Sequence, residues 1–126
     1  MAWSSHKGVI FLVDDDAEFR VTLQEALESA GYYVLPARDG NEALARMKGL
    51  NGNSVAIVDL IMPRMSGWDL IETMRADRNL SKIPIVAVSS EVTFKKGRPA
   101  TGADRLLAKP FDVPKLLRAV DELMIN

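Results

Sequence analysis

The stretch that decides the fold is VAIVDLIMPRMSG, residues 55–67. Its first four residues are small or branched and apolar, which is typical of a strand buried on both faces. Asp59 follows this run, and Pro63 and Gly67 then interrupt regular structure. A buried strand that ends in a carboxylate presents that carboxylate at an edge of the sheet. Asp59 is therefore the first candidate functional residue.

Four more apolar runs resemble this one. The expected strands are Val9–Val13, Tyr32–Pro36, Val55–Val58, Ile85–Val88 and Leu106–Ala108. The runs are continuous rather than alternating, so we expect helices on both faces of the sheet. With right-handed crossovers, the pattern predicts an α/β fold of five βα units and a parallel sheet in the order 2-1-3-4-5.

Helical periodicity fills the connections. The residues expected to face inward are Phe19, Leu23, Leu27 and Ala30; Ala43, Met47 and Leu50; Leu70, Ile71 and Met74; and Val113, Leu117, Val120 and Met124. Helix starts are indicated at Asp39 with Glu42, at Ser66 with Asp69, and at Asp112. In the fourth connection, Gly97 and Pro99 cost about 1 and 3 kcal/mol inside a helix, so that helix is expected to be short or irregular.

The bulk composition bounds the function. The chain has 126 residues and is read as a single domain, residues 1–126, with a core from about 8 to 124. It has no cysteine, which excludes disulfides and thiolate sites, and the single His6 argues against a Ser/His/Asp hydrolase or a multi-histidine metal site. A net charge of −1 favours neither nucleic acid nor an anionic membrane. With no signal peptide and no spanning segment, we expect a cytoplasmic protein without a membrane partner.

Other strand ends also carry reactive side chains. Asp14 and Asp15 follow the first run, Ser89 follows the fourth, and Lys109 follows the fifth. Ligands of open parallel sheets bind at the carboxyl ends of strands where the strand order reverses, here between strands one and three. Asp14 and Asp15 should therefore converge with Asp59. Three carboxylates repel one another, and a hard cation removes that conflict.

The predicted cation is Mg²⁺, which prefers oxygen ligands. Its expected ligands are Asp14, Asp15, Asp59 and a backbone carbonyl near Ile61. Asp59 is the candidate nucleophile, because a carboxylate can accept a phosphoryl group as an acyl phosphate. Lys109 would balance the developing charge and Ser89 would donate a hydrogen bond to it. The small neighbour Ser90 would leave room for the incoming group.

At these residues the chain resembles the receiver domain of two-component response regulators, including single-domain chemotaxis-type receivers. The matching motifs are Asp14-Asp15, DLIMPRMSG at residues 59–67, Ser89-Ser90-Glu91, Gly102-Ala103-Asp104 and Lys109-Pro110-Phe111. They cover nearly the whole chain, in order and at the expected spacing. The resemblance implies a doubly wound, flavodoxin-like three-layer sandwich and a cis peptide between Lys109 and Pro110.

The resemblance also implies a function. A sensor histidine kinase or phosphotransfer protein would donate a phosphoryl group to Asp59 in a Mg²⁺-dependent reaction, and the domain would then remove that group itself. The domain would be a signalling switch rather than an enzyme with turnover, and its changed surface would surround the fourth and fifth strands and helices. It is expected to be a monomer or weak dimer. The downstream target or output domain is not indicated.

Two features depart from the family pattern. Many receivers carry an aromatic residue three positions before the lysine, where this chain has Leu106. The usual readout couples the Ser89 position to rotation of that ring, so Leu106 cannot report in the same way. The Gly97 and Pro99 segment also alters the usual output surface. Ile61 and Glu91 lie beside the site in sequence and are expected to tune hydrolysis.

Several residues have simpler interpretations. Asp16 is expected to cap the first helix, and His6 is expected to have no function. Trp3 is expected to lie in a frayed terminus. Trp68 is expected to pack or to be partly exposed. Lys95, Lys96 and Arg98 are most simply a solvated loop, with partner contact as the alternative.

The sequence allows three alternatives to a stand-alone receiver. The chain could be a receiver fragment of a larger regulator or hybrid kinase. The second alternative is an aspartate-nucleophile phosphatase of the haloacid dehalogenase type. That family requires its nucleophile on the first strand and a Thr or Val at the position where this chain has Glu18. A flavodoxin-like cofactor binder or a receiver used only for contacts is the third alternative, but acids after the first strand would repel a flavin phosphate.

Overall fold

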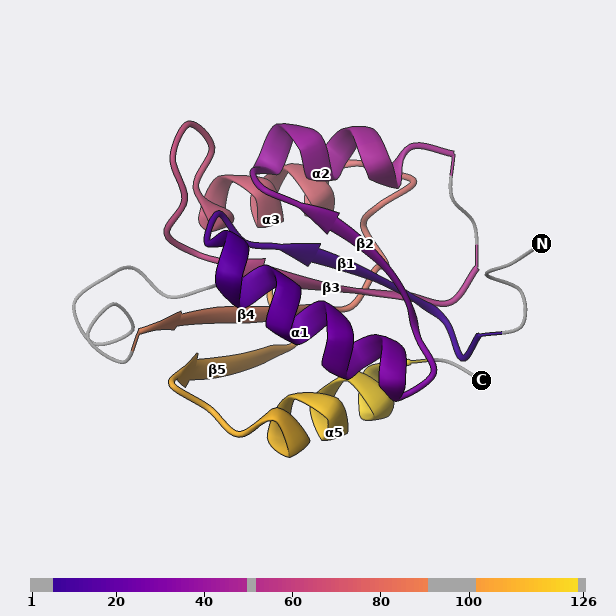
Figure 1. The fold of residues 1–126 in the computed structure, drawn as a ribbon. Helices are drawn as coiled ribbons and strands as arrows, with labels where there is room; N and C mark the ends of the chain where they lie inside the picture. The colour runs from indigo at the N-terminus through magenta and orange to yellow at the C-terminus, as the bar shows by residue number, and fades with distance from the viewer. Residues whose placement is uncertain (1–5, 50–51, 91–101, 125–126) are drawn as a thin grey trace.

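The computed structural model describes residues 6–49, 52–90 and 102–124. One five-stranded parallel sheet runs through it in the order β2-β1-β3-β4-β5 (Figure 1). The strands are β1 (Val9–Val13), β2 (Tyr33–Ala37), β3 (Ser54–Asp59), β4 (Ile85–Ser90) and β5 (Arg105–Lys109). The predicted strand order is confirmed, and each strand lies within one or two residues of the expected range.

Helices cover both faces of this sheet. They are α1 (Ala17–Ser29), α2 (Gly40–Met47), α3 (Gly67–Ala76) and α5 (Val113–Leu123). In Figure 1, α2 and α3 lie on one side of the strands and α1 and α5 on the other, which confirms the three-layer arrangement. The expected short or irregular fourth helix falls on residues 91–101, which lie outside the described residues.

The central strands are buried on both faces, as their continuous apolar sequence predicts. In β1, Phe11 belongs to the core that α2 and α3 complete, and its neighbours Ile10 and Leu12 belong to the core that α1 and α5 complete. All three side chains are nearly inaccessible to solvent. The sheet is therefore held from both sides, and its carboxyl ends form a rigid edge.

Side-chain caps begin three of the helices. Asp16 accepts a hydrogen bond from the Phe19 N–H at the start of α1, which confirms its expected role as a cap. Asp39 caps α2 in the same way, and Ser66 caps α3. Asp112 stands at the predicted start of α5, but its side chain makes no capping hydrogen bond.

The inward face of α5 was predicted imperfectly. Leu116 and Ala119 are buried together with the expected Val120 and Met124, whereas Val113 and Leu117 are only partly buried. Both sets of positions repeat at helical spacing, so periodicity alone does not choose between them. The choice follows from packing, because α5 contacts α1 and its buried residues share a core with the sheet.

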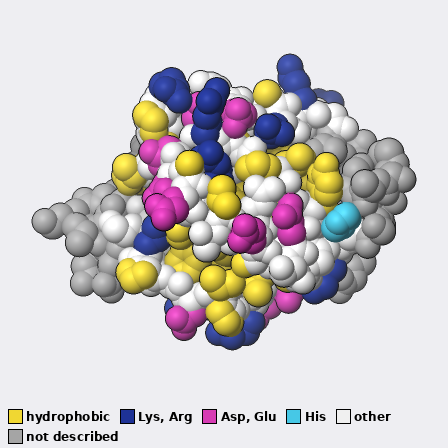
Figure 2. Space-filling view, viewed as in Figure 1, with side chains coloured by type: hydrophobic (Ala, Val, Ile, Leu, Met, Phe, Trp, Pro, Cys, Tyr) yellow, Lys and Arg dark blue, Asp and Glu magenta, His cyan; other side chains and the backbone are white. Residues whose placement is uncertain are grey.

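The surface carries both signs of charge. On the face shown in Figure 2, acidic side chains gather across the middle, where α1 lies in Figure 1, and several basic ones lie above them. The mixture agrees with the net charge of −1. Among the described residues, no helix is long and apolar enough to cross a membrane.

Candidate functional site

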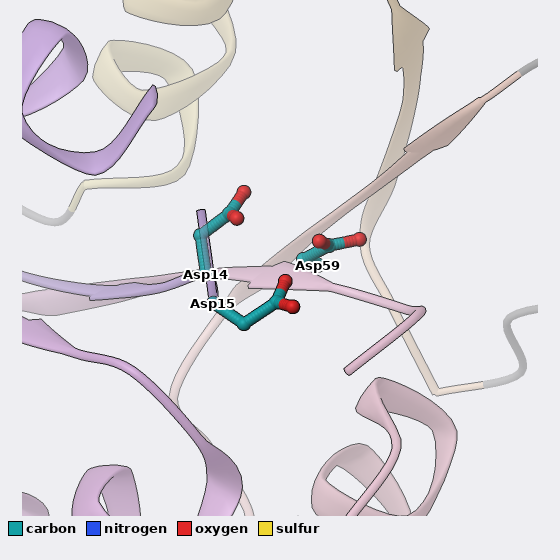
Figure 3. Close-up of side chains that lie close together, drawn as sticks. All are labelled: Asp14, Asp15 and Asp59. Carbon is teal, nitrogen blue, oxygen red and sulfur yellow. The ribbon is translucent and has the colours of Figure 1, made fainter. Parts of the chain in front are cut away.

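The predicted acids meet at the carboxyl end of the sheet. Asp14 and Asp15 leave the end of β1, and Asp59 is the last residue of the neighbouring strand β3 (Figure 3). Carboxylate oxygens of all three residues lie within 4.8 Å of one another. Asp14 and Asp59 are buried, and Asp15 is exposed. The cluster therefore has a closed side within the sheet and an open side toward solvent.

Lys109 enters this cluster from the end of β5. Its Nζ lies 3.0 Å from Asp14 Oδ2 and 3.6 Å from Asp59 Oδ2. The other Asp14 oxygen, Oδ1, accepts a hydrogen bond from the Asp16 N–H. The peptide bond between Lys109 and Pro110 is cis, as the resemblance implied. One ammonium thus contacts two of the three acids.

Asp59 lies in an environment that disfavours its charge. Its residue is only 6% exposed, and burial is the main reason that its pKa is raised from the ordinary 3.8 to about 6. The negative charge of Asp14 adds to this rise. Lys109 and the Ile61 N–H, which donates to Asp59 Oδ1 at 3.2 Å, act in the opposite direction. The carboxylate is desolvated but retains two groups that stabilise its anion.

A close backbone contact holds the turn that follows Asp59. The Gly67 N–H donates to the Leu60 carbonyl, and a Cβ added to Gly67 would lie 2.2 Å from the Asp59 carbonyl oxygen. No side chain fits there, so glycine lets the start of α3 approach β3. Arg64, with a φ of 66°, forms an ion pair with Asp39 at 2.9 Å. The turn is therefore attached both to β3 and to the start of α2.

Ser89 lies at the same edge of the sheet. It follows Val88, the register partner of Asp59, and it pairs in register with Ala108, which precedes Lys109. Ser89 is buried and its neighbour Ser90 is exposed. The strand register therefore brings the predicted hydroxyl between the strand that carries Asp59 and the strand that carries Lys109.

Sequence reasoning missed two contacts from the first turn of α1. The Lys109 ammonium lies over the ring of Phe19, 4.0 Å from its centroid. Arg20 donates from a guanidinium nitrogen to the Asp14 carbonyl oxygen at 2.7 Å. Phe19 was predicted only as an inward-facing helix residue, and no sequence signal connects it with Lys109. The contact depends on how α1 lies against the end of β5.

The other singled-out residues include exposed side chains. Leu106 on β5 is 54% exposed, and the side chain of Ile61, whose N–H contacts Asp59, is exposed to the same extent. Trp68 packs partly buried against the core of α2 and α3, as expected. His6 is exposed and makes an edge-to-face contact with Tyr33.

Some singled-out residues lie beyond the described ranges. They are Trp3, Leu50, Glu91, Lys95, Lys96, Gly97, Arg98 and Pro99. The interpretations given for them therefore stay predictions.

The donor set suits a divalent cation. Three carboxylates and one ammonium carry a formal charge of −2 when all are ionised. Carboxylate oxygens are the ligands that Mg²⁺ prefers, and it needs only one or two of them together with water. A doubly charged ion that contacts this cluster would offset the remaining charge, so the residues present fit Mg²⁺.

The chain is similar in sequence and in structure to known response regulators. The chain is 35% identical over 127 residues to the probable transcriptional regulator ycf27 of Porphyridium aerugineum, covering 95% of this chain and 52% of that protein. The chemotaxis response regulator CheY4 of Vibrio cholerae has a similar structure, with a TM-score of 0.82 and 31% identity over 92% of this chain and 98% of that one. TrrA of Thermotoga maritima, in complex with Mg(2+)-BeF, gives a TM-score of 0.81 and 27% identity over 92% and 98%.

The length of the match differs among relatives. The chain spans about half of ycf27 and of a further regulator, and 13% of a sensor kinase. The family pattern of the response regulator receiver domain matches residues 10–121, nearly all of this chain. With the sheet order and the acidic cluster already described, this match shows that the chain belongs to the receiver-domain family of two-component response regulators.

Proposed function

We propose that this receiver domain accepts a phosphoryl group on Asp59 from a histidine kinase or phosphotransfer protein and works as a phosphorylation-activated switch. The observation that carries the proposal is the buried Asp59 carboxylate beside two further acids and Lys109. A carboxylate with a raised pKa, in a cluster that fits Mg²⁺, is suited to nucleophilic attack on phosphorus.

Each residue has a distinct proposed role. A carboxylate oxygen of Asp59 forms the new bond to phosphorus, while the bond from phosphorus to the donor breaks and its electron pair leaves with the donor. Lys109 lies near Asp59 Oδ2 and would balance the charge of the transferred group. Ser89 would donate its hydroxyl hydrogen to a phosphoryl oxygen.

Asp14, Asp15, Asp59 and the Ile61 carbonyl would hold Mg²⁺, which when bound supplies positive charge to the phosphoryl oxygens. The crystallised complex of TrrA with Mg(2+)-BeF supports a metal in this family. In this chain the Ile61 N–H donates to Asp59 Oδ1. The residue would then contribute from both sides of its backbone, by its N–H to Asp59 and by its carbonyl to the metal.

We propose that the domain accepts one phosphoryl group per chain and is not an enzyme that turns over a separate substrate. The same cluster would promote hydrolysis of the acyl phosphate, in which water attacks phosphorus and the Asp59 carboxylate leaves, and this would reset the switch. The phosphatase alternative finds no support, because Glu18 lies exposed on α1 and the buried acid with the raised pKa is on β3. A cytoplasmic location and a monomeric or weakly dimeric state stay predictions.

The proposed switch can belong to a larger protein. The matched relatives include a transcriptional regulator about twice as long as the match and a sensor kinase of which the match is a small part. We therefore keep the alternative that this receiver belongs to a longer regulator or hybrid kinase.

The test is incubation with a small phosphodonor and Mg²⁺, read by intact mass. The wild-type chain should gain one phosphoryl group, and Asp59→Asn should gain none. Asp112→Asn is the matched control, because Asp112 is an exposed acid whose side chain makes no capping hydrogen bond. Equal labelling of wild type and Asp59→Asn would contradict the proposal, and continuous consumption of donor that persists in Asp59→Asn would favour a phosphatase.

A further inference from the structure

Lys109 has a long, flexible side chain, yet its ammonium must stay between two acids. Three methylene groups beyond Cβ leave the ammonium free to follow the strongest charge. It lies 3.0 Å from Asp14 and 3.6 Å from Asp59, so it is closer to the acid that is not the proposed acceptor.

A third contact also restrains the ammonium. The ammonium lies over the face of Phe19, 4.0 Å from the ring centroid. The π-face of an aromatic ring attracts a cation, and it does so without a formal charge. The ring can therefore hold Lys109 without adding another anion to a cluster that already contains three acids.

The ring itself is held in place. Phe19 meets Phe111 edge to face, with centroids 5.9 Å apart and planes at 85°. Phe111 follows Lys109 by two residues, and Phe19 lies in the first turn of α1. The Phe19 N–H also donates to the Asp16 cap, and both phenylalanines are only partly exposed. The aromatic pair thus joins the start of α1 to the turn that carries Lys109.

We propose that Phe19 is a positioning residue, whose ring holds the Lys109 ammonium within reach of Asp59. The kinetic part of this proposal rests on phosphoryl transfer to Asp59. The contact between Phe19 and Lys109 does not, so it can be tested without metal or phosphodonor.

The first measurement is the NMR chemical shift of the Lys109 ε-methylene protons in metal-free protein, assigned by their absence in Lys109→Arg. The ring current of Phe19 should shift them upfield of the other lysines. Phe19→Leu should abolish the shift, and Phe19→Trp should keep it, because both aromatic residues present a π-face. An unchanged shift in Phe19→Leu would overturn the proposal, whatever the outcome for phosphorylation.

The second measurement is the rate of labelling by a small phosphodonor at saturating Mg²⁺. Phe19→Leu should lower the maximal rate about tenfold with little change in the donor concentration at half-maximal rate, and Phe19→Trp should restore it. A normal maximal rate in Phe19→Leu, with the ring-current shift lost, would also overturn the positioning role.

Phe111→Leu is the matched control. It removes the other ring of the pair but keeps the Phe19 ring that contacts Lys109, so it should affect the rate and the shift less than Phe19→Leu does. Equal effects of the two variants on the rate would indicate a purely structural role and would contradict the proposal. If Phe19→Leu does not fold, Phe19→Met tests the same loss of the ring.

If wild-type protein is not labelled at all, the proposed function fails, and the chemical shift alone still decides whether Phe19 holds Lys109. The two failures are therefore distinguishable.

Discussion

The two ends of the sheet differ in how completely their charged side chains are paired. At the amino ends of β4 and β5, Arg75 donates to the carbonyls of Ser81, Ile83 and Gly102 and to the Asp104 carboxylate. At the carboxyl ends of β1 and β3, three carboxylates gather, and Lys109 forms ion pairs with two of them, Asp14 and Asp59. One end satisfies its charges and the other leaves an excess of negative charge.

The difference separates structural from functional electrostatics. The Asp104 carboxylate also accepts from the Ile85 N–H, so the arginine and the acid complete one network that joins α3 to two strands. The pKa of Asp59, in contrast, is raised by burial and by neighbouring acids. An excess of buried negative charge lowers stability but attracts a cation, which is the combination that a binding site needs.

The largest expected effect is a gain of stability on removing the Asp59 charge. Because the folded pKa is about 6 and the ordinary value is 3.8, this group favours folding most at low pH, and its contribution is lost as pH rises toward 6. In EDTA, Asp59→Asn should therefore exceed wild type by about 3 kcal/mol at pH 7.5. Chemical denaturation from pH 4 to 7.5 measures this difference.

The pH profile is the sharper part of that prediction. The stability gap between wild type and Asp59→Asn should open between pH 4 and 6 and stay constant above that range. The exposed Asp112→Asn serves as control and should show no such gap. A gap that does not change with pH would mean that the ends of the sheet do not differ as described.

Removing Arg75 from the network at the opposite end of the sheet should lower the stability of the fold. Arg75→Met leaves three carbonyls and the Asp104 carboxylate without this donor, and we expect a loss of about 2 kcal/mol. Thermal or denaturant unfolding measures the loss, and Arg118→Met on the exposed surface of α5 is the control. A stable Arg75→Met protein would show that the network contributes little.

Addition of Mg²⁺ should offset the excess of negative charge at the carboxyl ends of β1 and β3, so the two ends of the sheet should differ less. Free Mg²⁺ at ten times its dissociation constant should stabilise wild type by about 1.4 kcal/mol, because the ion binds only the folded acid cluster. Asp15→Asn should need more Mg²⁺ for the same shift, while its stability in EDTA should change little, since Asp15 is exposed. Equal Mg²⁺ responses of the two proteins would remove Asp15 from the ligand set.

The smallest expected effect concerns the ion pair between Arg64, in the turn after Asp59, and Asp39. A hydrogen bond from the Glu42 N–H is the main reason that the pKa of Asp39 is lowered, and a hydrogen bond from Arg64 lowers it further. Its contribution to stability is thus present above the ordinary pKa of 3.8 and is lost as pH falls through the lowered value. Arg64→Met should cost about 0.5 kcal/mol, less at high salt, in denaturation at pH 7. An effect as large as that of Arg75→Met would contradict the view of this pair as a weak contact whose arginine is largely exposed.

Much of the fold follows from local sequence. Continuous apolar runs predict strands covered on both faces, and acids or serine before helical periods predict the starts of α1, α2 and α3. The acids at strand ends, Asp14, Asp15 and Asp59, could be predicted to meet because parallel strands end at one edge of the sheet. Their convergence is a consequence of strand order and needs no knowledge of side-chain packing.

The sequence by itself therefore determined which strands form, the edge at which the acids gather and the lysine that joins them. Tertiary structure decided which face of α5 is buried, how Arg64 reaches Asp39, and that Phe19 lies against Lys109. The physical reason is the range of the interactions. Strand and cap patterns act within a few residues of one chain segment, whereas these contacts depend on how separate helices and turns pack around the sheet.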